Sequence, residues 1–228
     1  MTLTYAWQYF KKNAEATRKT IELEKSLLVS RLEILKGQLN THFLFNTLHT
    51  ISSLVVRNKN EEANRMLVKL SDLLRFALKE NNDQLIPLAR ELEILGLYLD
   101  IQKERFKERL SVEFNVAETL DQALIPAMLL QPVVENAVRY AIEPYSEKGT
   151  INIHIADNNG RLKIVVSDNG PVPFKTINFN TGIGLHNCKE RLRQLFGEDY
   201  VFRLEANGYT GTRVCLELPL ELSKNGTN

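Results

Sequence analysis

The chain has 228 residues, 43% of them hydrophobic, and a formal net charge of +1 from 29 basic and 28 acidic residues. This length accommodates one large domain or two small ones with cores of their own. The near-neutral charge lacks the basic footprint of a nucleic-acid-binding protein, so we expect no nucleic-acid partner. The two cysteines, Cys188 and Cys215, lack metal-site spacing and predict a reducing, cytosolic environment, with Cys188 as a small buried residue.

Residues 3–10 are rich in aromatic side chains and run directly into Lys11 and Lys12. This pattern is typical of the cytoplasmic end of a membrane helix, although the chain has no apolar run long enough to span a bilayer. One interpretation is a membrane segment that precedes the chain, and the other is an apolar helix start in a soluble protein. We expect the first, with the chain as the cytoplasmic portion of an inner-membrane protein.

Residues 14–54 are predicted to form one long helix. Its apolar residues recur at heptad spacing, at Ile21, Leu28, Leu32, Leu35 and Leu39. This repeat predicts a coiled coil, and a single stripe of this kind needs a partner, so we expect a homodimer. His42 and Asn46 fall on the next positions of the same register.

A second helix is predicted over residues 61–78, after the polar turn Asn58-Lys59-Asn60. Residues 81–83 break it, and Pro87 suits the first turn of a further helix that runs to about Leu110. Two antiparallel helices in each chain, paired across a homodimer, would form a four-helix bundle.

The second half alternates between strands and helices. Strands are predicted at 111–116, 151–155, 162–166, 200–204 and 213–220, and helices at 127–142 and 182–196. Asn159-Gly160 is a strong hairpin signal between two of the strands. The fold class is therefore α+β, with helices followed by a two-layer sandwich that contains antiparallel strands.

His42 is a candidate nucleophile, because a neutral imidazole can attack the γ-phosphorus of a nucleotide when the approach is in line. Asn46, four residues later, lies on the same helix face and could orient the ring. The alternative is a histidine packed at a bundle interface, and this is the simpler interpretation of the segment taken alone.

Three further motifs contain residue types that can bind parts of a nucleotide. The amide oxygen of Asn136 suits Mg²⁺, and Arg139 on the same helix face can meet phosphate oxygens. Asp168-Asn169-Gly170 follows a strand and could accept a hydrogen bond from an adenine amine, while Gly182-Ile183-Gly184-Leu185 opens a helix whose backbone could bind phosphates. Each motif alone is also common as a polar ridge or a turn, and only their ordered combination is specific.

In this order and spacing the motifs resemble the LytS-type sensor histidine kinases of bacterial two-component systems. The resemblance runs from about Leu35 to Leu220 and includes the histidine segment and residues 70–76, 87–92, 98–106, 135–140, 168–170 and 182–192. It implies a domain of dimerisation and phosphotransfer helices at 1–85, with the signalling coiled coil, and a Bergerat-type ATP-binding domain at 86–228.

The resemblance further implies an ATP-dependent protein-histidine kinase that passes phosphate to an aspartate of a response regulator. His42 would be the phospho-acceptor and Asn46 a supporting residue. The implied ATP and Mg²⁺ ligands are Asn136 for the metal, Asp168, Gly170 and Thr212 at the adenine end, and Arg139, Tyr140, Gly182, Gly184 and Leu185 around the nucleotide.

The chain departs from the family pattern at two informative positions. Thr41 replaces a proline, and Val172 replaces the second glycine that follows Asp168. Because of Val172, one alternative is a catalytically weak kinase that acts as a dimeric signalling scaffold. A superfamily ATPase is a further alternative, but the glutamate that activates water in those enzymes is replaced by Pro132, so we favour the kinase.

Overall fold

The computed structural model describes residues 41–79, 84–171 and 183–223. The chain divides into two compact units, residues 1–46 and 47–228. The predicted coiled coil up to Leu39, the break at 81–83, Val172 and Gly182 lie outside the described residues. Within the described ranges, no helix has both the length and the apolar character needed to cross a membrane.

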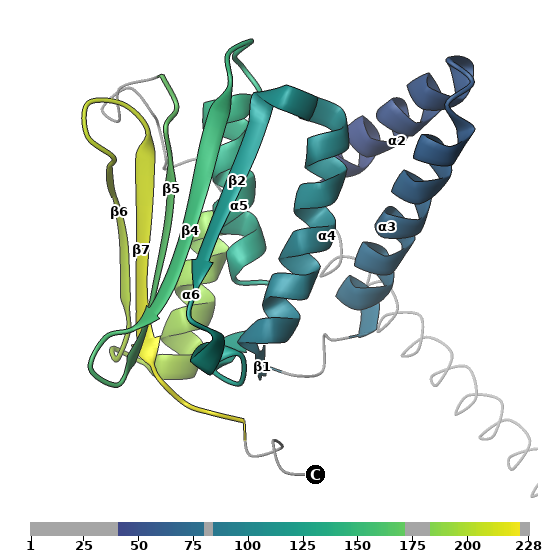
Figure 1. Ribbon diagram of the computed structural model, residues 1–228. Coiled ribbons are helices and arrows are strands. Elements are labelled where there is room, and N and C mark those ends of the chain that lie inside the picture. Colours follow the sequence, from purple (N-terminus) through teal and green to yellow (C-terminus); the bar gives the residue numbers. More distant parts are fainter. Residues whose placement is uncertain (1–40, 80–83, 172–182, 224–228) are drawn as a thin grey trace, which may run out of the picture. The chain divides into compact units, whose positions relative to one another are not determined.

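The two helices predicted before residue 80 are α2 (Thr41–Val56) and α3 (Asn60–Lys79) (Figure 1). Asn58 joins them with a positive φ of 59°. The amide of Asn58 donates to the carbonyl of Val55 at 2.9 Å, and that of Lys59 donates to the carbonyl of Leu54 at 2.9 Å. A left-handed asparagine with such hydrogen bonds ends a helix, so the predicted polar turn is confirmed.

Helix α3 contacts α4 (Leu88–Phe106). Its buried side chains recur every three or four residues, at Ala63, Met66, Leu70, Leu73 and Phe76. Lys69 Nζ lies 2.7 Å from Asp100 Oδ2, and the Arg90 guanidinium carbon lies 4.5 Å from the centre of the Phe76 ring. Because partly exposed ion pairs stabilise a fold by only about 0–1 kcal/mol, the apolar stripe holds α3 in place.

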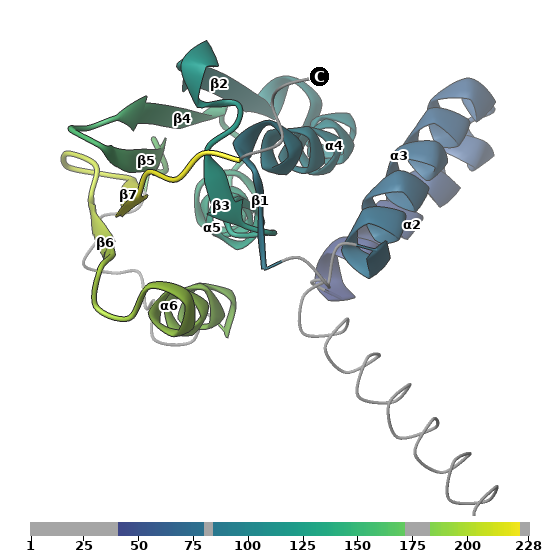
Figure 2. The same cartoon turned by 90° about the horizontal axis from the view of Figure 1, so that it is seen from below.

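The second half forms a five-stranded sheet covered on one face by helices (Figures 1 and 2). The strand order is β2 (Leu110–Val116), β4 (Gly149–Asp157), β5 (Arg161–Asp168), β7 (Thr212–Pro219) and β6 (Val201–Ala206). Helices α4, α5 (Leu130–Ala137) and α6 (Ile183–Phe196) form the second layer. The predicted α+β architecture with a two-layer sandwich is confirmed.

One pair in this sheet is not antiparallel. Strands β2 and β4 pair in parallel, with Leu110 opposite Gly149 and Val116 opposite Ile155, while the other pairs are antiparallel. A parallel pair needs a long crossover, and α5 lies in the connection between the two strands.

The β4–β5 hairpin turns at the predicted Asn159-Gly160, both with positive φ, at 56° and 80°. Alternate residues of β5 are buried: Leu162, Ile164, Val166 and Asp168. This period of two is that of a strand with one face on the core. Asp168 therefore occupies the last core-facing position of its strand.

The helix predicted over 127–142 is interrupted. Helix α5 covers Leu130–Ala137, and a π-helical turn, η4, covers Val138–Ile142, where the amide of Glu143 donates to the carbonyl of Val138 at 2.9 Å. The sequence has no signal for this wider turn. π-Helical turns are frequent at functional sites.

A small sheet that the sequence did not predict pairs β1 (Leu85–Pro87) with β3 (Leu124–Pro126). Both strands have the sequence Leu-Ile-Pro, which is too short and too proline-containing to read as a strand. Pro87 thus ends β1 immediately before α4 instead of lying in the first helical turn. Short 3-10 turns, η2 (Lys107–Arg109) and η3 (Glu118–Leu120), complete the described elements.

Candidate active site

Asp168 is the most enclosed of the predicted site residues within the described part of the chain, with its side chain 2% exposed. Its Oδ1 accepts hydrogen bonds from the amides of Gly170 at 2.9 Å and Thr212 at 3.1 Å. The hydroxyl of Thr212 bonds to Oδ2. The structure therefore brings Thr212 to Asp168 and Gly170, although Thr212 lies more than forty residues further along the sequence.

Two glycines let the backbone approach this carboxylate closely. A Cβ at Gly170 would lie 3.0 Å from the Cβ of Ala141, on η4. A Cβ at Gly211 would lie 2.3 Å from the carbonyl oxygen of Asp168, which also accepts a hydrogen bond from Asn207 Nδ2 at 2.7 Å. The loop before β7 is thus fastened to the end of β5.

We expect Gly211→Ala to lower the free energy of unfolding by about 3 kcal/mol or more. The positive φ of 79° costs an L-residue roughly 1 kcal/mol, and the overlap with the Asp168 carbonyl adds about 2 kcal/mol. Gly208→Ala is the matched control, because Gly208 has the same φ but nothing within 4 Å of its added Cβ. Urea denaturation measures both, and equal losses would contradict the close approach.

The predicted metal and phosphate residues lie on α5, η4 and α6. Asn136 and Tyr140 are half-buried, while Arg139 is exposed with its guanidinium carbon 5.7 Å from the centre of the Tyr140 ring. A Cβ at Gly184 would lie 3.3 Å from the Cβ of Pro132, so the start of α6 packs tightly against α5. Leu185, next in the chain, is buried at 8% exposure.

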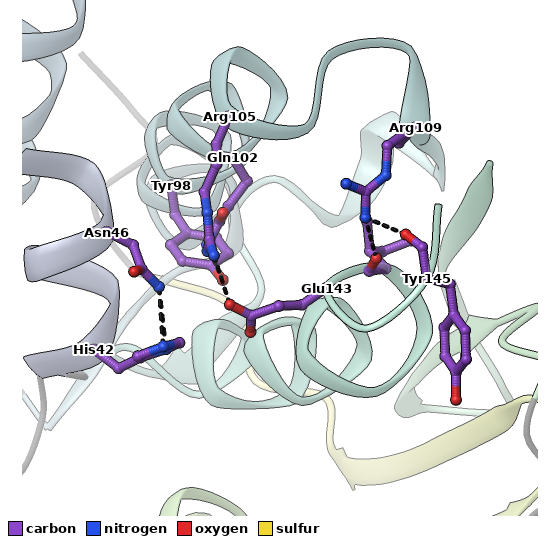
Figure 3. Close-up of polar contacts among 9 residues, drawn as sticks. His42, Asn46, Tyr98, Gln102, Arg105, Arg109, Glu143 and Tyr145 are labelled. Carbon is purple, nitrogen blue, oxygen red and sulfur yellow. Dashed lines mark hydrogen bonds and ion pairs between the residues drawn. The ribbon is translucent and has the colours of Figure 1, made fainter. Parts of the chain in front are cut away.

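The far end of η4 is held by two arginines from the α4 region (Figure 3). Arg105 forms an ion pair with Glu143 at 2.6 Å. Arg109 donates to the carbonyl of Ile142 at 2.8 Å and also to the carbonyl of Tyr145. These bonds satisfy carbonyl groups that a helix end leaves without intrahelical partners.

His42 lies on α2 with an exposed side chain. Asn46 Nδ2 is 3.2 Å from its Nδ1 and 3.1 Å from its Nε2 (Figure 3). The amide N–H can donate only to a ring nitrogen that lacks a proton, and the two similar distances allow either tautomer to accept it. The expected i, i+4 contact is present, and the roles of both residues stay predictions.

Sequence reasoning missed Glu91 on α4. Its carboxylate is 1% exposed, and it accepts hydrogen bonds from the amides of Met128 at 2.7 Å and Leu130 at 2.8 Å. Burial raises the pKa of Glu91 to about 7, against the opposing effects of these amides and of Arg191. The available signal was an acidic residue within the apolar stripe of Leu88 and Leu95, where an unpaired charge is rarely found.

Glu91 makes the stability of the fold dependent on pH. Its pKa of about 7 in the folded chain lies above the ordinary value of 4.5, so the folded state binds the proton more tightly. The resulting stabilisation is complete below the ordinary value and is lost as the pH rises through about 7. The linkage amounts to about 3 kcal/mol.

We therefore expect the unfolding free energy of the wild type, minus that of Glu91→Gln, to fall by about 3 kcal/mol between about pH 4.5 and pH 8. Subtracting the variant removes the contributions of all other titrating groups. Glu93→Gln, a more exposed position on the same helix, is the control. A difference for Glu91→Gln that is flat with pH would show that the carboxylate stays charged in the fold.

Cys188 is buried at 5% exposure, as expected, with its Sγ 3.8 Å from the carbonyl of Leu129. Burial raises the pKa of its thiol to about 12. The thiolate is the reactive form of cysteine, so Cys188 is an inert packing residue at neutral pH.

Comparison with known proteins places the two halves in families. The histidine kinase family model matches residues 30–110. The model described as "Histidine kinase-, DNA gyrase B-, and HSP90-like ATPase" matches residues 123–222. Together the two models cover α2, α3 and α4, and the part of the chain from β3 to β7 that includes α5 and α6.

Curated relatives align with most of the chain. Sensor histidine kinase YesM of Bacillus subtilis is 36% identical over 202 residues, which are 86% of this chain and 35% of that protein. Sensor protein LytS of Oceanobacillus iheyensis is 36% identical over 211 residues, which are 87% of this chain and 36% of that protein. The chain thus spans about a third of the length of these relatives.

Among solved structures, the catalytic domain of histidine kinase ThkA aligns at a TM-score of 0.47 and 17% identity, covering 61% of this chain and 97% of that one. The family assignment depends on the sequence matches alone. On the two matching family models and these relatives, the chain belongs to the LytS-type sensor histidine kinases.

Proposed function

We propose that this chain is the kinase portion of a sensor protein, which uses ATP to phosphorylate His42 and passes the phosphoryl group to an aspartate of a response regulator. The observation that carries the proposal is the buried Asp168 carboxylate, held by Gly170 and Thr212 at the end of β5. A buried carboxylate whose oxygens are held by neighbouring donors at a sheet end is a pre-oriented hydrogen-bond acceptor for a ligand.

The adenine end of the nucleotide would be read by Asp168. Its carboxylate can accept a hydrogen bond from the exocyclic amine, and Thr212 and the Gly170 amide fix its orientation. A Cβ at Gly170 would lie 3.0 Å from both the Ala141 Cβ and Asp168 Oδ1, so glycine keeps this turn close beside the carboxylate. The residues present therefore fit an adenine nucleotide.

The phosphate end would be bound by α5, η4 and the start of α6. The oxygen of Asn136 suits Mg²⁺, which in nucleotide sites combines one or two protein ligands with phosphates and water. Bound there, the metal would neutralise charge on the phosphates. Arg139, Tyr140 and the backbone from Gly182 to Leu185 are the further proposed contacts, with Gly182 outside the described residues.

His42 would act as the nucleophile. Its exposed ring is accessible, and Asn46 restrains its orientation. The helices up to about residue 85 would pair with those of a second copy in a four-helix bundle, and residues 86–228 would be the ATP-binding domain. The aromatic residues before Lys11 and Lys12 support a position on the cytoplasmic side of an inner membrane.

The geometry of α5 argues against water activation as the main reaction. Glu135, adjacent to the metal residue Asn136, accepts a hydrogen bond from Gln131 Nε2 at 2.9 Å. The position one turn before Asn136 is Pro132, which packs against the start of α6 and cannot act as a base. Histidine phosphorylation is therefore the better supported use of bound ATP.

Incubation with γ-labelled ATP and Mg²⁺ tests the proposal. Label on the protein that is labile in acid and stable in base is expected, followed by its transfer to a response regulator. Free phosphate without labelled protein would indicate an ATPase instead. Neither product would indicate a signalling scaffold, in which Val172 has weakened the nucleotide site.

A further inference from the structure

The turn that begins α5 is held from two sides by ionisable residues that the proposed chemistry does not use. From α4, Glu91 accepts the amides of Met128 and Leu130. Met128 has a positive φ of 56°, a conformation that costs a residue other than glycine about 1–2 kcal/mol. Such a turn persists only where its surroundings hold it.

From α6, Arg191 bonds to one carbonyl group of the same turn and to one that precedes β1. Its guanidinium donates to the carbonyl of Ala127 and, at 3.3 Å, to that of Gln84. Arg191 is half-buried, and its positive charge acts on the Glu91 carboxylate. An acidic residue of α4 thus binds the amides of the turn, and a basic residue of α6 binds one of its carbonyl groups.

This junction connects the two helices that would face the phosphates. Helix α5 leads to Asn136, and α6 begins at the phosphate-binding motif, where Gly184 packs on Pro132. Since the two motifs lie on separate helices, their spacing depends on how α6 is attached to the start of α5. The bonds of Arg191 and Glu91 are polar connections at that attachment.

We propose that Glu91 and Arg191 are positioning residues, which hold α6 against the start of α5 and so align the phosphates of bound ATP. The inference depends on the proposed function, because it assigns these residues to the same site. Neither residue would touch the nucleotide. Phosphoryl transfer is governed by alignment, and a displacement of about 1 Å can lower its rate about 100-fold.

The adenine end provides an internal reference. Asp168 lies at the end of β5 and is fixed by Gly170, Asn207 and Thr212, none of which bonds to Glu91 or Arg191. Loosening the α5–α6 junction should therefore weaken recognition of phosphates while adenosine still binds. General destabilisation would weaken both ligands together.

The test compares Arg191→Lys and Glu91→Gln with Arg193→Lys and Glu93→Gln, more exposed positions on the same two helices. Lysine keeps the charge of Arg191 but cannot present a planar fork to two carbonyls. Calorimetry would measure the binding of adenosine and of Mg²⁺ with a non-hydrolysable ATP analogue. Labelling from γ-labelled ATP at saturation would measure the rate.

For Arg191→Lys and Glu91→Gln we expect analogue affinity and labelling rate each to fall about tenfold or more, with adenosine affinity within about twofold of the wild type. The control variants should match the wild type. Equal losses for adenosine and the analogue, or a lower melting temperature with both affinities unchanged, would show a purely structural brace and overturn the inference.

Measurements on the wild type distinguish a failure of the proposed function from a failure of the positioning role. If it binds neither probe and takes up no label, the proposed function fails, and the positioning role fails with it. If it binds and is labelled while Arg191→Lys behaves like Arg193→Lys, only the positioning role is wrong. The comparison of Arg191→Lys with Arg193→Lys decides this outcome by itself.

Discussion

Replacing His42 with glutamine is expected to abolish covalent labelling of the protein by γ-labelled ATP. Glutamine keeps a polar side chain on the helix but lacks a nucleophilic ring nitrogen, so no phosphoramidate bond can form. The helix should be retained, because glutamine has a higher helix propensity than histidine. Binding of ATP to the C-terminal half should be unchanged.

His49→Gln is the matched control for this variant. His49 lies seven residues further along α2, is also exposed, and has no proposed role. The control should be labelled at the wild-type rate, and circular dichroism should show equal helix content in both variants. Full labelling of the His42 variant would place the phospho-acceptor elsewhere and contradict the proposed function.

Replacing Asp168 with asparagine is expected to lower ATP affinity about 100-fold while the fold is retained. The asparagine oxygen can still accept from the Gly170 and Thr212 amides, and its NH₂ group can donate to the Thr212 hydroxyl. This arrangement turns a donor toward the position of the adenine amine. The NH₂ group of the asparagine and the adenine amine are then two donors that face each other, where the carboxylate of Asp168 would have accepted a hydrogen bond.

Calorimetric titration with ATP measures this loss, and urea denaturation should show a change in unfolding free energy below about 1 kcal/mol. Asp157→Asn is the control, since Asp157 is an exposed residue of the neighbouring strand whose carboxylate accepts from the Gly160 amide at 2.8 Å. ATP affinity unaltered by Asp168→Asn would mean that adenine is not recognised there.

Local patterns accounted for most of the elements. The helix predicted over residues 61–78 is present as α3, and Asn159-Gly160 predicted the β4–β5 hairpin, because these signals act between neighbours in the chain. The alternation along β5 also reaches Asp168. A polar residue at the last core-facing position of a strand is a sequence signal. It indicates that an Asp-Asn-Gly segment belongs to a site instead of an ordinary surface turn.

Elements that depend on distant partners were not predictable in this way. The two Leu-Ile-Pro strands form a sheet only because β1 and β3 meet, nearly forty residues apart. The parallel pairing of β2 with β4 follows from the crossover through α5. The π-helical turn likewise has its end held by Arg109, on a different element.

The sequence by itself determined the order of the longer helices and strands and the chemical types of the candidate residues, because periodicity and motif spacing are properties of residues close together in the chain. Only the tertiary structure decided that Thr212 donates hydrogen bonds to Asp168, that Gly211 lies against the Asp168 carbonyl, and that Glu91 and Arg191 hold one turn. These contacts join residues from separate elements, and hydrogen bonding in a buried place is set by the packing of the whole domain.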